Sequence, residues 1–204
     1  MRVLVIGATG TIGRAVADTL AHTHDVVRIG HSSGDVRISL ESTDSMEKAF
    51  AALKPFDAVV CAAGVAVFKP FARLTDADYQ LSISNKLMGQ VNLVRVGLRH
   101  ISDRGSFTLT GGVLAQEGAA GGAAIGMVNA GLEGFVRNAC LDMPRGVRVN
   151  VVSPPWVSET LEAMGQNAAA GLPAIVVARA YVEAVEGAKN GQVLDPRYYE
   201  DESL

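Results

Sequence analysis

The chain has 204 residues, of which 49% are hydrophobic and 19% are charged, and its formal net charge at pH 7 is -3. This length and composition fit one α/β domain over residues 1–204, and a domain of this size buries about 70% of the surface that its unfolded chain exposes. The slightly acidic balance and the lack of a basic block exclude nucleic acid and anionic membrane as expected partners.

No segment approaches the about 20 apolar residues of a membrane span, and the apolar run at the amino terminus is too short for a signal peptide, so a cytoplasmic protein is expected. The cysteines, Cys61 and Cys140, lie far apart and lack the spacing of a zinc site or a disulfide framework. We therefore expect two free thiols and no bound metal.

Short β-rich runs alternate with longer helical patterns, which is typical of a doubly wound parallel sheet with helices on both faces. If the two halves wind outward from the first strand, the strand order is 3-2-1-4-5-6-7, and ligands bind at the carboxyl edge where this order reverses. The expected helices cover residues 12–22, 43–53, 75–98, 123–143 and 173–186. The seven expected strands are Arg2–Ile6, Asp25–Ile29, Val36–Ile38, Ala58–Cys61, Ser106–Thr110, Val147–Val152 and Gln192–Leu194.

Residues 3–13 join an apolar run to a glycine-spaced turn and the start of a helix. Gly7 permits the tight turn, Gly10 lets the backbone approach a pyrophosphate, and Gly13 lets the helix pack closely on the sheet. Amides at the helix start then face the anion. The spacing is G-x-x-G-x-x-G, and its strand and helix flanks supply the context of a dinucleotide-binding loop. The expected contacts are Gly7, Thr9, Gly10, Thr11, Ile12 and Gly13.

The end of the second expected strand indicates which dinucleotide binds. Proteins that prefer NAD usually place a carboxylate there for the ribose 2′-hydroxyl, but this chain has none before Asp35. His31, Ser32 and Ser33 could instead donate to a 2′-phosphate, so NADP(H) is favoured over NAD(H). The alternative interpretation makes His31 an exposed loop residue and Arg28 a strand residue that points to solvent.

Four segments together resemble the short-chain dehydrogenase/reductase family: residues 7–13, Cys61-Ala62-Ala63-Gly64, Leu132-Glu133-Gly134 and residues 149–154. The similarity covers residues 2 to about 194. It implies a Rossmann fold, an NAD(P)(H) cofactor and a homodimer or homotetramer built from the two long central helices. It also implies that Ala62, Ala63 and Gly64 lie beside the adenine-ribose part of the cofactor, and that Pro154, Val157 and Thr160 lie near its nicotinamide and pyrophosphate. Pro155 replaces the family's glycine, and Thr160 is displaced by one residue.

The catalytic residues of that family are missing. The family has a Ser after the fifth strand and Tyr-x-x-x-Lys on the next helix, whereas this chain has no lysine between Lys86 and Lys189. Alignment on residues 132–134 puts Gly111 at the Ser position, Ile125 at the Tyr position and Asn129 at the Lys position. The family's Asn, on the helix after the fourth strand, falls on Lys86. Asn and Lys are therefore exchanged. The tyrosines are Tyr79, Tyr181, Tyr198 and Tyr199.

The exchange makes Lys86, Asn129 and Thr110 the candidate catalytic residues. An ammonium at Lys86 could reach the nicotinamide ribose, with Asn129 in the uncharged polar role. Lys86 could supply a proton if burial lowers its pKa, and Thr110 or Ser84 could relay one from water. Two alternatives stay open: Lys86 extends to solvent, or Asn85 takes the place of the family's Asn.

Two functions remain, because one fold hosts both enzymes and regulators. The favoured one is an NADP(H)-dependent oxidoreductase acting on a carbonyl/alcohol pair with non-standard catalytic residues. The alternative is a catalytically silent dinucleotide-binding sensor or regulatory subunit. An apolar pocket for a small or medium carbonyl compound is predicted from Gly111, residues 118–124, Phe68, Phe71, Met127 and Trp156.

Overall fold

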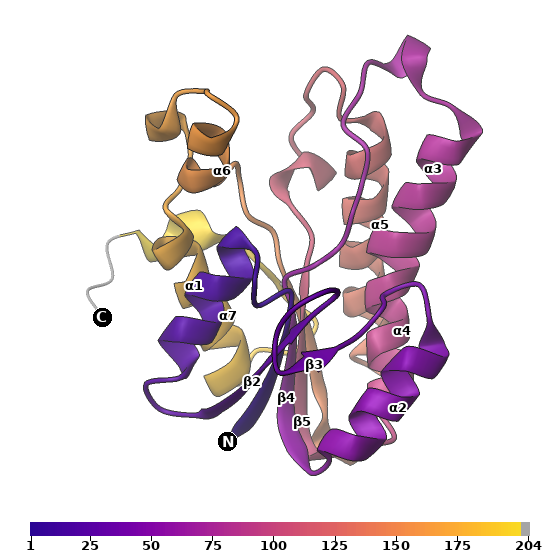
Figure 1. Cartoon of the computed structure of the whole chain (residues 1–204), viewed down its shortest axis with the longest axis vertical. Helices are drawn as coiled ribbons and strands as arrows, with labels where there is room; N and C mark the ends of the chain where they lie inside the picture. The colour runs from indigo at the N-terminus through magenta and orange to yellow at the C-terminus, as the bar shows by residue number, and fades with distance from the viewer. Residues whose placement is uncertain (201–204) are drawn as a thin grey trace.

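The structure is a computed structural model that describes residues 1–200. Within these residues seven parallel strands form one sheet in the order β3-β2-β1-β4-β5-β6-β7, so the predicted topology is confirmed. Figure 1 shows the sheet nearly edge-on between two helical layers. The strands are β1 (Arg2–Ile6), β2 (Asp25–Gly30), β3 (Val36–Arg37), β4 (Phe56–Cys61), β5 (Ile101–Thr110), β6 (Arg148–Val152) and β7 (Val193–Leu194).

Helices cover both faces of the sheet. In Figure 1, α1 and α7 lie on one side of the strands, and α2, α3, α4 and α5 lie on the other. The helices are α1 (Thr11–Leu20), α2 (Thr43–Leu53), α3 (Asp76–Ser82), α4 (Met88–Gly97), α5 (Ala123–Ala139), α6 (Ser158–Ala163) and α7 (Ala174–Glu186). This arrangement is the doubly wound α/β architecture that the alternating pattern predicts.

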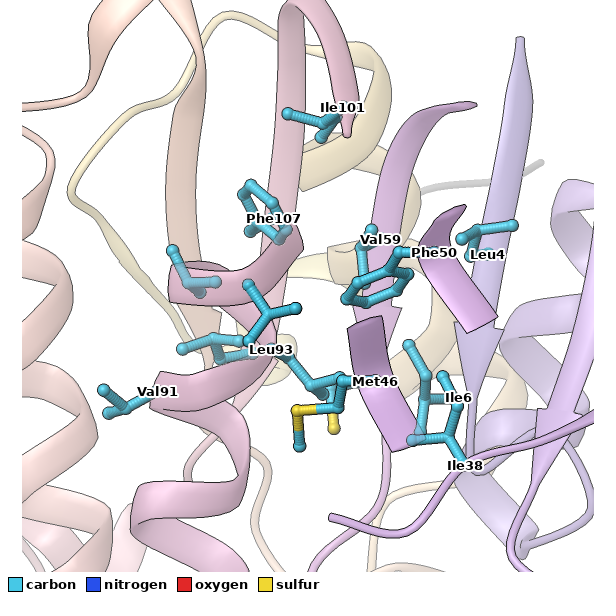
Figure 2. Close-up of a cluster of buried hydrophobic side chains, with 14 of the residues drawn as sticks. Leu4, Ile6, Ile38, Met46, Phe50, Val59, Val91, Leu93, Ile101 and Phe107 are labelled. Carbon is cyan, nitrogen blue, oxygen red and sulfur yellow. The ribbon is translucent and has the colours of Figure 1, made fainter. Parts of the chain in front are cut away.

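The central strands are buried on both faces, so they contribute alternate side chains to two cores. In β1, Leu4 and Ile6 belong to the core under α2 and α4, whereas Val3 and Val5 belong to the core under α1 and α7. Figure 2 shows the first of these cores, with Phe50 among the sheet side chains. The continuous apolar runs in the sequence follow directly from this two-sided burial.

Several element boundaries differ from the predicted ones. The helix expected over residues 75–98 is divided by a π-helical turn at Ile83–Leu87, and the helix expected over 123–143 ends at Ala139. The fifth strand begins at Ile101 rather than Ser106. Of its residues before Ser106, only Ile101 pairs with β4, and the register is irregular between these two positions. These differences depend on packing between elements, which local periodicity does not encode.

The end of the described chain is also ordered by packing. Pro196–Tyr199 forms a 3-10 turn, and Pro196 and Tyr199 are buried. Arg179 of α7 donates to the carbonyl of Tyr199 at 2.8 Å. The described end of the chain is therefore a packed segment, and residues 201–204 lie outside the described part.

No helix within residues 1–200 has both the length and the apolar character needed to cross a membrane. The same residues contain no group of three His, Cys, Asp or Glu side chains arranged to hold a metal ion.

Candidate functional site

A cavity of about 440 Å³ opens at the carboxyl edge of the sheet, beside the first strand, where the strand order reverses. Its volume lies within the roughly 300–1,000 Å³ usual for small-molecule sites. Seven of the predicted cofactor residues lie together in its wall: Gly7, Thr9, Gly10, His31, Ala62, Ala63 and Gly64. The remaining lining residues are Ile6, Gly30, Ile38, Ser39, Leu40, Glu41, Val65 and Asn85.

The glycine loop has the geometry that its sequence predicts. Gly7 has a φ of +85°, a left-handed conformation that favours glycine. A Cβ on Gly13 would lie 2.0 Å from the Gly7 carbonyl oxygen, so only glycine allows α1 to pack this closely. A Cβ on Gly10 would meet only that same oxygen, at 3.4 Å, which leaves the cavity side of Gly10 accessible. This open cradle fits a pyrophosphate.

The other predicted cofactor residues do not line this cavity: Thr11, Ile12, Gly13, Ser32, Ser33, Lys86, Pro154, Val157 and Thr160. Ile12 packs against the core under α1 and α7. Val157 is buried and forms a β-bridge with Leu172. Ser32 and Ser33 are exposed next to His31. The roles of these residues in binding a cofactor stay predictions.

Sequence reasoning missed the part of the wall formed by Ile38, Ser39, Leu40 and Glu41. These residues follow β3, whose carboxyl end meets the same sheet edge as β1 and β2, so the predicted strand order was a signal that could have found them.

Two charged residues near β2 are already paired. Arg28 contacts Asp18 at 2.7 Å, and Asp35 accepts from the Arg28 backbone at 2.9 Å.

The π-helical turn Ile83–Leu87 contains two consecutive residues, Asn85 and Lys86, whose side chains both reach the carboxyl edge of the sheet. Asn85 accepts a hydrogen bond from the Val65 amide at 2.8 Å and lines the cavity. Lys86 donates from Nζ to the carbonyl of Gly111 at 3.1 Å. Its stem lies against Gly64, where an added Cβ would be 3.1 Å from Lys86 Cγ. Lys86 therefore points inward beside the cavity, whereas Asn85 lies in the cavity wall. Such turns often occur at functional sites.

The surroundings of Lys86 weaken its hold on a proton. Burial lowers the pKa of Lys86 from 10.5 to about 8, an effect that the nearby Cys61 slightly opposes. Cys61 is no anionic partner at neutral pH, because burial raises the pKa of its thiol to about 12. An ammonium has three N–H groups, and Gly111 accepts one of them. Two remain for a ligand.

Asn129, on α5, reaches the neighbouring carbonyl. Its Nδ2 donates to the Gly112 oxygen at 3.3 Å, and the residue is only 1% exposed. Its Oδ1 is buried without a hydrogen-bond partner among the described residues. Buried polar atoms are normally satisfied, so an unpaired acceptor here points to a missing donor. Lys86 and Asn129 thus bind two consecutive carbonyls of the loop after β5.

Thr110 is directed elsewhere, which corrects its assignment as a catalytic candidate. Phe107 and Leu109 point into the core under α2 and α4, so the alternation of the strand turns Thr110 to the opposite face. There its hydroxyl is hydrogen-bonded to the Tyr181 hydroxyl and to the Cys61 carbonyl, each at 2.5 Å. Both contacts hold it beneath α7. Ser84 bonds the Leu81 carbonyl at 3.5 Å on its own helix.

None of the four tyrosines lines the cavity. Tyr181 is fully buried in α7 beneath the sheet, and Tyr198 and Tyr199 belong to the carboxyl-terminal 3-10 turn. No tyrosine from elsewhere in the chain replaces the missing hydroxyl at this cavity.

The predicted apolar pocket is assembled only in part. Phe68 and Trp156 meet edge to face, with ring centroids 5.8 Å apart and an interplanar angle of 80°. Phe68 also approaches Gly121, where an added Cβ would be 3.2 Å from its ring. These contacts join the loops after β4, β5 and β6. Phe71, by contrast, is 75% exposed and has no place in this cluster.

Known proteins match most of this chain. The model of a family described as enoyl-(acyl carrier protein) reductase matches residues 2–187. The 3-oxoacyl-(acyl-carrier-protein) reductase FabG of Aquifex aeolicus (strain VF5) is 27% identical over an alignment of 187 residues, and the match covers 79% of this chain and 75% of that protein.

Two solved structures extend the comparison. The protein lin1944 from Listeria innocua is 38% identical, with a TM-score of 0.91 over 96% of this chain and 98% of that one. A small-chain dehydrogenase in complex with NADPH shares the fold at 22% identity, with a TM-score of 0.84 over 96% and 95% of the two chains. Together with the strand order and the glycine loop, these matches show that the chain belongs to the short-chain dehydrogenase/reductase family.

Proposed function

We propose that this protein is an NADP(H)-dependent oxidoreductase that interconverts a carbonyl compound and an alcohol, with Lys86 in place of the family's missing acid. The observation that carries the proposal is the inward-pointing Lys86 ammonium, whose stem packs on the Gly64 that also lines the dinucleotide cavity. The open cradle at Gly10 supports the cofactor assignment.

In the reducing direction, NADPH held in this cavity would supply the hydride for the carbonyl carbon, and the carbonyl oxygen must gain a proton from the protein. Lys86 donates that proton from one of the two N–H groups that Gly111 leaves available, and the resulting amine regains a proton from water. A positioned acid contributes about 10²- to 10⁴-fold to the rate. A pKa of about 8 suits this role, because most of Lys86 is protonated at neutral pH and yet releases its proton readily.

Asn129 supports the proton donor without carrying charge. Its amide holds the Gly112 carbonyl, and its unpaired Oδ1 is an acceptor for a water or a ribose hydroxyl. The family's lysine is thereby replaced by an amide on α5, and its asparagine by a lysine beside the π-helical turn. The exchange keeps one cation and one amide at the site.

NADP(H) is favoured because the only carboxylate close after β2, Asp35, accepts a backbone hydrogen bond from Arg28. His31 lines the cavity and is available to a 2′-phosphate. The bound NADPH of the similar dehydrogenase is consistent with this choice. Replacing His31 with Asp is expected to weaken the binding of NADPH relative to that of NADH. The control is Glu41→Gln, which removes a carboxylate that already lies in the cavity wall.

The substrate we propose is a small or medium uncharged carbonyl compound. In the segments that would surround it (residues 62–68, 111–126 and 153–157) the one charged side chain is Glu117, which is paired with Arg197. The Phe68–Trp156 pair adds an apolar surface where these three segments meet.

A fluorescence titration with NADPH and NADH tests the proposal, using Trp156, the single tryptophan, as the energy donor. The titration is repeated with Lys86→Ala, and a panel of carbonyl compounds is added to each complex. Oxidation of bound NADPH that depends on substrate and is lost in Lys86→Ala supports the enzyme. Tight binding without oxidation supports the silent sensor, which the absence of the family's Ser and Tyr favours. No binding refutes both functions.

A further inference from the structure

Glu133 is a buried carboxylate that the proposed chemistry does not use. It lies on α5 and is only 3% exposed. Its oxygens accept hydrogen bonds from Ser153 Oγ at 3.2 Å, from Gln116 Nε2 at 3.0 Å and from Arg137 at 2.8 Å. Burying a charge costs several kcal/mol unless it is well paired. The pairing here connects three different parts of the chain.

Two of these contacts fix the segment that follows β5. Gln116 ends the 3-10 turn Val113–Ala115, which also holds the end of β6 through a bond from the Val113 amide to the Pro154 carbonyl at 3.1 Å. Ser153 Oγ occupies the space beside Gly111, since a Cβ on Gly111 would be 2.9 Å from it. Glu133 therefore holds both sides of the segment from Gly111 to Gln116.

That segment carries the carbonyls that orient the proposed site. Gly111 accepts from Lys86, and Gly112 accepts from Asn129, which lies four residues before Glu133 on the same helix. One face of α5 thus contacts the segment twice, through Asn129 at its start and Glu133 at its end. A shift at Gln116 would be transmitted through the 3-10 turn Val113–Ala115 to the Gly111 carbonyl that accepts from Lys86.

We propose that Glu133 is a positioning residue, which sets the place of the Lys86 ammonium by anchoring the Gly111–Gln116 segment to α5 and to the end of β6. This inference rests on the proposed function of Lys86. It predicts that loss of the Glu133 anchor harms the chemical step more than cofactor binding, because the cavity at the glycine loop has no contact with Glu133.

The test compares Glu133→Ala with Glu133→Gln and with Arg137→Ala, which removes only the half-exposed partner of the same carboxylate. In Glu133→Ala we expect kcat to fall about 10- to 100-fold, the scale of a displacement of about 1 Å at a reacting group. The dissociation constant for NADPH should change less than about threefold. Glu133→Gln should restore most of kcat, because its amide oxygen still accepts from Ser153 or Gln116. Arg137→Ala should match the wild type.

An independent readout separates this inference from the proposed function. The Lys86 side chain is followed by NMR of its ¹³Cε as the pH is raised, which requires neither cofactor nor turnover. Loosening the segment should admit water and raise the pKa of Lys86 toward its ordinary value in Glu133→Ala, whereas removing a negative charge alone would lower it. If Glu133→Ala does not fold, the double variant Gln116→Ala/Ser153→Ala removes the same anchors while keeping the Arg137 pair.

The outcomes are distinct. An unchanged kcat and an unchanged Lys86 titration in the variants overturn the role of Glu133. A wild type that neither binds nor oxidises NADPH overturns the proposed function, and the Lys86 titration then still decides whether Glu133 positions that side chain.

Discussion

The Lys86 ammonium lies in surroundings that disfavour a charge. The property that suits it to donate a proton therefore also lowers the stability of the folded protein. The stem lies against Gly64 and the ammonium is held by one carbonyl, with no acidic side chain among its hydrogen-bond partners in residues 1–200. Lysine stems commonly extend to solvent, and this one does not. The Lys86 side chain points to the carboxyl edge of the sheet, whereas a lysine with only a surface role would be exposed to solvent.

The lowered pKa of Lys86 predicts the pH dependence of reduction. The ammonium that donates the proton is lost as the pH rises through about 8. We expect kcat/KM for carbonyl reduction to be level below this pH and to fall about tenfold per pH unit above it, as for a single required acid. Lys86→Met should abolish this basic limb, and Lys48→Met, an exposed control, should leave it intact. A profile unchanged in Lys86→Met would exclude Lys86 as the acid.

The same residue should limit stability. Its pKa is about 8 in the folded protein and 10.5 ordinarily, so between these pH values the unfolded chain binds more protons and stability rises with pH. At pH 7 Lys86 is charged in both the folded and the unfolded chain, so the folded protein bears the full cost of burying this charge. Lys86→Met is therefore expected to raise the free energy of unfolding by about 1–3 kcal/mol. Urea denaturation at pH 7 and pH 10 checks this, and a gain that does not shrink at pH 10 would contradict it.

At the scale of elements, the β1 turn and α1 behave as one unit. The Gly7 amide bonds the Ile29 carbonyl at 2.8 Å, and Gly13 lets α1 approach Gly7. The turn is thereby fixed to β2 on one side and to α1 on the other. Its shape is set before any ligand arrives, which favours tight binding.

Two glycine variants separate folding from binding in this unit. Gly13→Ala forces a Cβ to 2.0 Å from the Gly7 oxygen, so we expect it to lower the free energy of unfolding by several kcal/mol. Gly10→Ala should fold normally but bind NADPH at least about tenfold more weakly, because its methyl group enters the pyrophosphate cradle. Gly134→Ala, with nothing within 4 Å of its Cβ, is the control. Thermal unfolding measures the stability of the three variants, and NADPH titration measures their binding. Normal binding by Gly10→Ala would contradict the assignment of Gly10 to the pyrophosphate cradle.

The divided helix after β4 shows why element boundaries resist prediction. Residues 75–98 have one continuous helical pattern, but the chain inserts a π-helical turn at Ile83–Leu87 so that Asn85 reaches Val65 and Lys86 reaches Gly111. These two partners, the Val65 amide and the Gly111 carbonyl, come from two other loops. The sequence therefore left Asn85 and Lys86 as alternatives, whereas the structure uses both.

For the whole molecule, cofactor binding and folding should be coupled. The cavity is built from the ends of β1 and β2 and the segments after β3 and β4, so a ligand within it bridges elements that are distant in the chain. Binding to the folded state alone adds about 2.7 kcal/mol of stability when the ligand is at 100 times its dissociation constant. We expect NADPH to raise Tm accordingly and NADH to raise it less at equal concentration. Equal shifts would contradict the preference for NADP(H).

Sequence by itself determined the parallel sheet, its strand order and the glycine loop, because these follow from local periodicity and from steric demands within a short segment. It also established that the chain contains no Tyr-x-x-x-Lys motif, since residue identity needs no coordinates. Only the tertiary structure decided that Lys86 points inward, that Thr110 faces α7 and that Glu133 anchors the segment after β5. The direction of each of these side chains depends on partners 17 to 71 residues away along the chain, and such contacts arise only when the layers pack together.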